Sequence, residues 1–81
     1  MKIQLKLFSM AKEIAGYGDR TMELPSGSLA ETILNVITDR HPKLSPWRPI
    51  LRVAVNWEYV DNTHPLQDGD EVAIIPPVSG G

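Results

Sequence analysis

The feature that most constrains the fold of this chain is its one long amphipathic helix signal, in the segment PSGSLAETILNVITDRHP. Ser28 and Glu31 have the spacing of a capping box, in which two side chains each accept a hydrogen bond from a free amide at the helix start. Apolar residues recur at helical spacing, at Leu29, Ile33, Val36 and Ile37. Pro42 ends the pattern, so we expect a helix over residues 28–40. The single apolar face of this helix must be buried, and a sheet is the expected partner.

Strand signals precede the helix. The segment KIQLKLF, residues 2–8, alternates apolar and polar side chains as a half-buried strand does. The segment DRTMEL predicts a second strand, antiparallel to the first. Between them, SMAKEIAGYG predicts a short helical turn or loop that is closed by Gly16 and Gly18.

The second half of the chain predicts further strands. Pro46 and Pro49 interrupt KLSPWRPI, which we expect to be a rigid, irregular connection rather than helix. LRVAVNWEYV predicts one strand with a bend at Asn56. Asp68 and Gly69 predict a tight reversal, and EVAIIP, residues 71–76, predicts a central last strand that pairs with the first.

This order of elements predicts an α+β fold of the β-grasp type, the ubiquitin-like roll. We expect a mixed sheet of four to five strands with one main helix on its apolar face. The chain has no internal repeat or linker. We therefore expect one β-grasp domain over residues 1–77, followed by a flexible Gly-Gly tail over residues 78–81.

Composition removes several classes of function. Apolar residues make up 42% of the chain, and there is no cysteine. A disulfide framework, a thiolate metal site and a thiol nucleophile are therefore excluded, and this composition fits the reducing cytoplasm. The opening MKIQLKLFSM alternates, so it predicts neither a signal peptide nor a membrane span. We expect a cytoplasmic protein that does not bind a membrane.

The charges are unevenly distributed along the chain. The net charge of −2 does not favour nucleic acid as a partner. Residues 1–52 hold all eight Lys and Arg, whereas residues 53–81 hold five acidic residues and no basic one. The acidic half either steers a basic partner toward the tail or is a solvated set of turns.

The segment VSGG ends the sequence. Pro76 and Pro77 stop strand pairing and favour an extended path, along which six residues reach roughly 20 Å. Gly80 and Gly81 have no Cβ, so they fit a narrow channel and leave the final carboxylate unhindered. Either this end frays in solvent, or the Gly81 carboxylate is the working group after activation by ATP.

Three stretches resemble the ubiquitin-like sulfur-carrier family, in the form of the small subunit of molybdopterin synthase: MAKEIAG, VAVNWEYV and LQDGDEVAIIPPVSGG. The resemblance implies that Gly81 is adenylated, converted to a thiocarboxylate and used to donate sulfur to cyclic pyranopterin monophosphate, which forms the dithiolene of molybdopterin. Alternatives that use the same activated end are thiamin-type sulfur carriage and conjugation as a ubiquitin-like modifier.

The resemblance also implies the partners. These are the large catalytic subunit, in a heterotetramer, a ubiquitin-activating-type adenylyltransferase and a sulfur-donor system. The tail, Val78, Ser79, Gly80 and Gly81, is expected to enter the large subunit. The chain has no glycine-rich phosphate loop, so we expect it to bind no cofactor and ATP to be bound by the activating partner.

The predicted partner surface consists of Phe8, Trp57, Tyr59, Pro76 and Pro77. Phe8 is alternatively a residue at the boundary of the core. Trp57, like Trp47, either anchors an interface or covers the edge of the core. His41 and His64 each precede a proline in turn sequence and lack matched ligands, so we expect loop residues and no metal site.

Overall fold

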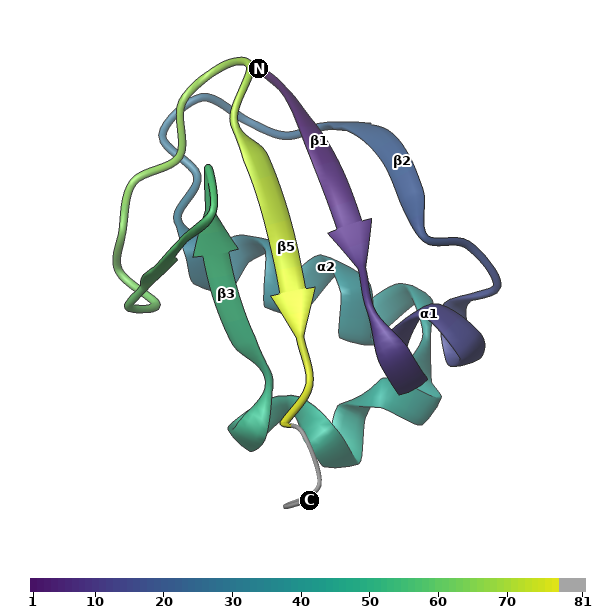
Figure 1. Ribbon diagram of the computed structural model, residues 1–81. Helices are drawn as coiled ribbons and strands as arrows, with labels where there is room; N and C mark the ends of the chain where they lie inside the picture. The colour runs from purple at the N-terminus through teal and green to yellow at the C-terminus, as the bar shows by residue number, and fades with distance from the viewer. Residues whose placement is uncertain (78–81) are drawn as a thin grey trace.

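The computed structural model describes residues 1–77 of the chain (Figure 1). Five strands, two α-helices and one 3₁₀ helix follow one another in these residues: β1 (Lys2–Leu7), α1 (Ser9–Ala15), β2 (Asp19–Glu23), α2 (Ala30–Arg40), η1 (Pro42–Ile50), β3 (Arg52–Val55), β4 (Glu58–Val60) and β5 (Glu71–Ile75). No helix in this part of the chain is both long enough and apolar enough to cross a membrane.

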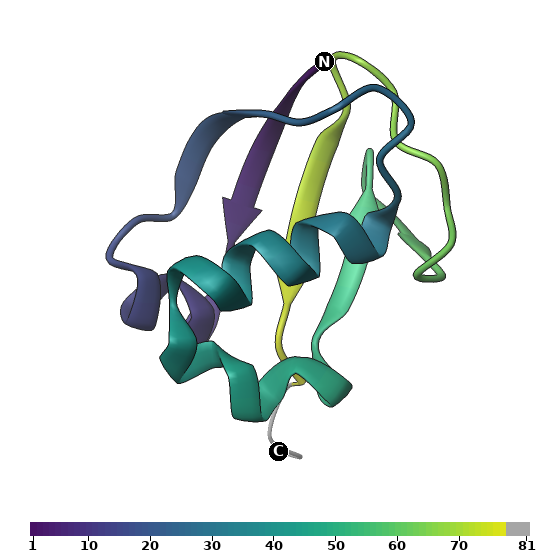
Figure 2. The same ribbon diagram turned by 180° about the vertical axis from the view of Figure 1, so that it is seen from behind.

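The strands form one mixed sheet in the order β2-β1-β5-β3-β4. β5 lies at the centre, parallel to β1 and antiparallel to β3, while β1–β2 and β3–β4 are antiparallel pairs. The predicted pairing of the first and last strands is confirmed by the register Leu5↔Val72 and Leu7↔Ile74. Helix α2 crosses one face of the sheet, as Figure 2 shows. The mixed sheet under one main helix confirms the predicted β-grasp fold.

The core lies between α2 and the sheet. Its fully buried side chains come from both layers: Ile3, Leu5, Leu7, Ile33, Leu34, Ile37, Leu44, Val53, Val72 and Ile74. The predicted apolar face of α2 is confirmed at Ile33 and Ile37, which are buried. The predicted Val36 is only half-buried, and Leu34, which was not predicted, is buried instead. Met22 fills the core, and Met10 packs partly against it.

The start of α2 differs from the predicted capping box of Ser28 and Glu31. The helix begins at Ala30 after the N-cap residue Leu29, and the Ser28 hydroxyl donates to the Pro25 carbonyl at 2.7 Å instead. Thr32 Oγ1 accepts the Leu29 amide at 3.0 Å. The first amides of the helix are satisfied from a distant loop, because Ala30 N donates to the His64 carbonyl and Glu31 N to the Asn62 carbonyl. A local cap by Thr32 together with tertiary partners therefore takes the place of the predicted pair Ser28 and Glu31.

Two connections also differ from the sequence-based predictions. The segment predicted as one bent strand is a hairpin of β3 and β4, because Asn56 and Trp57 both have positive φ, 50° and 72°. Two central residues of positive φ reverse the chain tightly, as in a type I′ turn. The segment predicted as irregular is η1, which holds Pro46 and Pro49 and is anchored by the buried Leu44.

The predicted turns at Gly16 and Gly69 are confirmed. Gly16 ends α1 at φ 87°, and its amide donates to the Lys12 carbonyl at 2.9 Å. Gly69 has φ 86° in the loop before β5. Both conformations favour glycine because a side chain there is strained.

Candidate functional site

The face of the sheet opposite α2 is open (Figures 1 and 2). The strand register divides the side chains of this face into two halves. Over β1 and β2, its side chains are polar, at Lys2, Gln4, Lys6, Asp19, Thr21 and Glu23. Over β5, β3 and β4, its side chains are mostly apolar, at Ala73, Ile75, Ala54 and Tyr59. Side chains alternate between the faces of a strand, so this division follows from the register that buries the opposite set.

The apolar half contains a shallow hollow of about 390 Å³. Six residues line it: Phe8, Ala54, Trp57, Tyr59, Ala73 and Ile75. Ala54 and Ala73 lie directly opposite each other on β3 and β5 and form its floor, because their side chains are the smallest in the lining. The three aromatic residues are 39%, 72% and 54% exposed, in chain order. We call this group of six residues the aromatic hollow.

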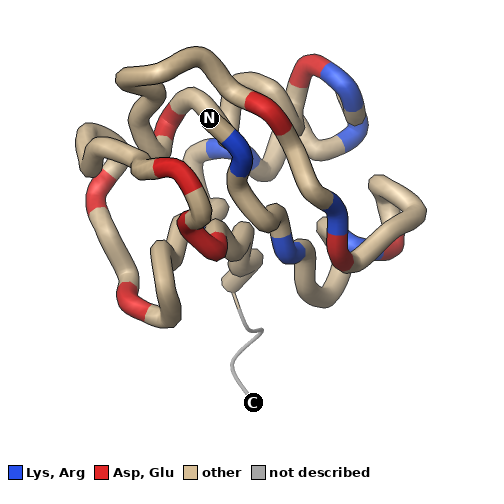
Figure 3. The backbone as a smooth tube through the Cα atoms, turned by 90° about the horizontal axis from the view of Figure 1, so that it is seen from above, with Lys and Arg blue, Asp and Glu red and all other residues tan. Residues whose placement is uncertain are grey.

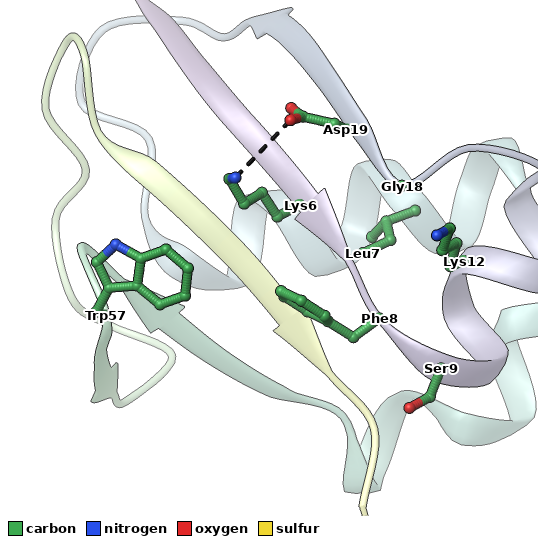
Figure 4. A pocket seen from close by; sticks show the side chains of 8 residues that line it. All are labelled: Lys6, Leu7, Phe8, Ser9, Lys12, Gly18, Asp19 and Trp57. Carbon is green, nitrogen blue, oxygen red and sulfur yellow. Dashed lines mark ion pairs between the residues drawn. The ribbon is translucent and has the colours of Figure 1, made fainter.

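Phe8 reaches the open face because it follows the buried Leu7 at the end of β1. It is the N-cap residue of α1, and its carbonyl accepts the Ala11 amide at 3.2 Å. Ser9, with φ 51°, turns the chain from the strand into the helix. Figure 4 shows the Phe8 ring lying over β5 and the Trp57 ring farther along the same face.

A second, more polar hollow of about 680 Å³ adjoins the first and shares Phe8 and Trp57 with it (Figure 4). Lys6 crosses its edge, where its ammonium lies 3.0 Å from a Glu71 carboxylate oxygen and 3.8 Å from one of Asp19. The hydrogen bond and charge of Glu71, with a smaller contribution from Asp19, raise the pKa of Lys6. Lys6 is therefore a protonated side chain whose charge is balanced by neighbouring carboxylates, and it lies beside the aromatic hollow.

Tyr59 stands at the other side of the aromatic hollow, on the edge strand β4. Arg52 places its guanidinium carbon 4.0 Å from the centre of the Tyr59 ring. Such a contact holds the ring against the sheet by cation–π attraction. Acidic residues follow Tyr59 in the chain, at Asp61, Asp68, Asp70 and Glu71. Figure 3 marks the Asp and Glu positions along the backbone in red.

The last described residues continue from the floor of the aromatic hollow. β5 carries Ala73 and Ile75 on the open face and ends at Ile75. Strand pairing therefore stops before Pro76, as predicted. Pro76 is buried and Pro77 is exposed. β5 ends beside η1 (Figures 1 and 2).

The structure brings three of the predicted partner-surface residues together, since Phe8, Trp57 and Tyr59 all line the aromatic hollow. Pro77 is exposed at the end of β5, but the burial of Pro76 removes it from the predicted surface. The predicted tail, Val78 to Gly81, lies outside the described residues. Sequence reasoning did not identify Ala54 and Ala73 as part of the site, and only strand alternation combined with the register could have done so.

The histidines lie apart from the aromatic hollow. His41 Nε2 is 3.3 Å from the Tyr17 hydroxyl, and both residues are half-buried. The carbonyl of His64 accepts the first amide of α2. Within residues 1–77, no three His, Asp or Glu side chains are grouped so that they could hold a metal ion.

Comparisons with known proteins agree with the fold and cover the undescribed end of the chain. The model of the ThiS family matches residues 5–81. The molybdopterin synthase sulfur carrier subunit of Chlamydomonas reinhardtii is 42% identical over 83 residues, covering 100% of both chains. That of Arabidopsis thaliana is 38% identical over 81 residues, covering 100% of this chain and 84% of the relative.

Two solved structures show the same architecture. SAMP1 from Haloferax volcanii has a TM-score of 0.85 at 27% identity, covering 100% of both chains. The putative molybdopterin converting factor subunit 1 from Pyrococcus furiosus has a TM-score of 0.85 at 30% identity, covering 96% of this chain and 99% of that one. The fold, the family match and the full-length similarity to the curated carriers lead to one conclusion: the chain belongs to the ThiS family.

Proposed function

We propose that this protein is the sulfur-carrier subunit of a molybdopterin synthase and acts in the cytoplasm. The observation that carries the proposal is the alignment with the Chlamydomonas carrier, which spans the whole of both chains at 42% identity. The family match also extends through Gly81. In this proposal, Gly81 donates one sulfur atom, as a thiocarboxylate, to cyclic pyranopterin monophosphate, and two such transfers form the dithiolene of molybdopterin.

The chemistry follows from the weakness of a carboxylate as an electrophile. Its negative charge resists attack, so an activating partner that binds ATP must first transfer AMP to the Gly81 carboxylate and release pyrophosphate. Hydrosulfide supplied by a donor system then attacks the acyl carbon, AMP leaves, and the thiocarboxylate remains. The chain contains no cysteine that could attack its own activated end.

The aromatic hollow supports a docking role for the open face. Aromatic side chains are among the residues that contribute most to binding energy in protein interfaces, and here three exposed ones surround a small apolar floor. β5 forms part of this floor and is the last strand before the tail in the sequence. A large catalytic subunit seated on this face, in a heterotetramer, would therefore receive the end of the chain close to where it binds the domain.

The test is deletion of Gly81, with molybdopterin formation measured in a synthase reconstituted with the large subunit. We expect the deletion to abolish sulfur transfer, because one residue of extended chain is roughly 3.5 Å and positioning errors of about 1 Å already reduce rates strongly. Gly81→Ala keeps the length and adds only a Cβ, so its effect should be milder than that of the deletion. Intact-mass analysis of protein from its native cell should show a gain equal to oxygen exchanged for sulfur. Full activity after the deletion would refute the proposal.

A second candidate is conjugation to lysine side chains as a protein modifier. The similarity to SAMP1 favours it, because that protein is a small archaeal modifier protein. Both functions need the same adenylated carboxylate, so deletion of Gly81 does not separate them. Covalent conjugates recovered from the native cell would support modification, whereas a thiocarboxylate with no conjugates would support sulfur carriage alone.

A further inference from the structure

The hairpin between β3 and β4 places a large aromatic residue where the backbone disfavours one. Trp57 has φ 72° and is the second central residue of a two-residue turn. Glycine, asparagine and aspartate are usual at such positions, because a larger side chain strains the left-handed backbone. Asn56, the first central residue, follows this preference and Trp57 does not.

Asn56 fixes the conformation that strains its neighbour. Its side-chain amide nitrogen donates to Asp70 Oδ1 at 3.0 Å, and its side-chain oxygen accepts the Glu71 amide at 3.0 Å. Its backbone amide donates to the Glu71 carbonyl at 2.8 Å. Three hydrogen bonds therefore clamp the turn to the start of β5. These bonds hold Asn56 in the turn, in which both central residues have positive φ.

Contacts within the described residues offset little of this strain. The Trp57 side chain is 72% exposed, the highest value among the exposed large apolar residues, and does not belong to the core. Its aromatic ring lies 5.8 Å from Lys6 Nζ, at the outer limit of a cation–π contact. That ammonium is already paired with Glu71. Strained backbone positions cluster where the strain serves a function, and the contacts of Trp57 within residues 1–77 leave room for such a function.

We propose that Trp57 is a strained interface anchor, kept at a cost to the free domain because its ring binds the large catalytic subunit beside the aromatic hollow. The inference rests on the proposed function, which supplies that partner. The position of the ring supports the choice of occupant. Trp57 and Phe8 line both the aromatic hollow and the more polar hollow, and the floor of the aromatic hollow includes Ala73 of β5, the strand that precedes the tail in the chain.

The proposal predicts that one substitution, Trp57→Gly, stabilises the free protein and weakens its binding to the large subunit. Trp57→Gly relieves the left-handed backbone and creates the dipeptide most favoured in such turns, so we expect the melting temperature of the free protein to rise by about 4 °C. The same substitution removes the ring, so we expect the dissociation constant for the large subunit to rise by about 30-fold or more. Substitution of a tryptophan with an ordinary structural role would instead reduce both the stability of the protein and its affinity for the large subunit.

The experiment combines melting curves of the full chain with calorimetric titration of the purified large subunit from the same organism. Trp57→Asn should behave like Trp57→Gly, because asparagine also tolerates the left-handed region. Trp57→Phe should keep the melting temperature near that of the wild type and lose less affinity. Trp47→Ala is the matched control, since Trp47 is exposed on η1 and does not line the aromatic hollow; we expect it to leave affinity within about threefold of wild type.

Several outcomes would overturn the proposal. Binding of Trp57→Gly within about threefold of wild type would show that the ring is no anchor. A fall in melting temperature would show that contacts within the chain offset the strain. If sedimentation shows that the wild type self-associates and Trp57→Gly does not, the occupant is a second copy. If the wild type does not bind the large subunit, the proposed function fails first, whereas binding that is insensitive to Trp57 refutes this inference alone.

Discussion

At the scale of single residues, the smallest side chains of the open face carry as much information as the aromatic ones. Ala54 and Ala73 pair across β3 and β5, and only 4% and 6% of their surfaces are exposed. Their burial comes from the surrounding rings and not from the core under α2. A larger side chain at either position would enter the aromatic hollow, where there is space.

Ala54→Leu tests whether the aromatic hollow is a docking site. Leucine would occupy part of the hollow of about 390 Å³, so we expect the affinity for the large subunit to fall about tenfold. Stability should change by less than about 0.5 kcal/mol, because nothing in the core is displaced. Urea unfolding and calorimetric titration measure the two effects. Ala30→Leu is the contrast, since Ala30 is fully buried in the core and overpacking there costs about 1–3 kcal/mol. Unchanged affinity of Ala54→Leu would exclude this hollow from the interface.

Asn56→Ala tests the clamp at the β3–β4 turn. The substitution removes two side-chain hydrogen bonds, to Asp70 and from Glu71, and places alanine in a left-handed conformation. We expect the free energy of unfolding to fall by about 2 kcal/mol. Thr63→Ala, in the next loop, is a comparison that leaves the clamp intact. Chemical denaturation measures both, and a loss below about 0.5 kcal/mol for Asn56→Ala would show that the turn does not depend on its side chain.

At the scale of elements, the start of α2 shows which expectations from sequence were reliable. The 3.6-residue period predicted the helix, and two-residue alternation predicted β1, because both depend only on which face is buried. The capping residues were wrong because the amides at the helix start find partners in a loop about thirty residues away, at His64 and Asn62. Such partners belong to tertiary structure, and a local motif cannot contain them.

The site was less predictable than the fold for a related reason. Phe8, Trp57 and Tyr59 could be named as exposed aromatic residues, but their meeting around Ala54 and Ala73 depends on strand register. The sequence predicts one strand where the structure has the β3–β4 hairpin, because Trp57 stands at the second turn position, where glycine is the usual residue. Trp57, which makes this prediction wrong, is also the residue that we place in the proposed interface.

Thr32→Ala tests the observed cap of α2. It removes the acceptor of the half-buried Leu29 amide, so we expect a loss of about 1 kcal/mol in unfolding free energy. Glu31→Ala should change the unfolding free energy by less than about 0.5 kcal/mol, because Glu31 contributes only its backbone amide to the contacts at this helix start. A larger loss for Glu31→Ala than for Thr32→Ala would restore the capping box predicted from the sequence.

The turn after β4 should be sensitive to acid. Asp61 Oδ1 accepts hydrogen bonds from the Thr63 hydroxyl at 2.8 Å and the Thr63 amide at 3.1 Å, and these bonds lower the pKa of Asp61. A carboxyl whose pKa is lower in the folded state stabilises the protein above its unfolded pKa. That stabilisation is lost as the pH falls through the folded pKa. The stability difference between wild type and Asp61→Asn should therefore be present at neutral pH and shrink below about pH 3.8. A difference independent of pH would contradict this assignment.

At the scale of the whole molecule, charge is divided along the chain while the open face stays nearly neutral. Residues 53–77 carry five acidic residues and no basic one, and Lys6 is already paired with two carboxylates. If the large subunit presents a basic surface, association should slow as salt rises, because the Debye length falls to about 10 Å at 0.1 M. Stopped-flow association rates at several salt concentrations test this. Glu58→Gln, on β4, should reduce the dependence, and a rate independent of salt would leave only the apolar contribution.

The central position of β5 has a consequence for how the molecule folds. β5 is the strand that joins the β1–β2 pair to the β3–β4 pair, and it pairs with β1 from the far end of the described chain. Isolated two-stranded pairs are marginally stable in water, and closing so long a loop is slow. Folding should therefore be cooperative and limited by the arrival of the last strand. A molecule in which β5 has not docked lacks Ala73 and Ile75 in its aromatic hollow, so an incompletely folded carrier cannot compete with the native one for its partner.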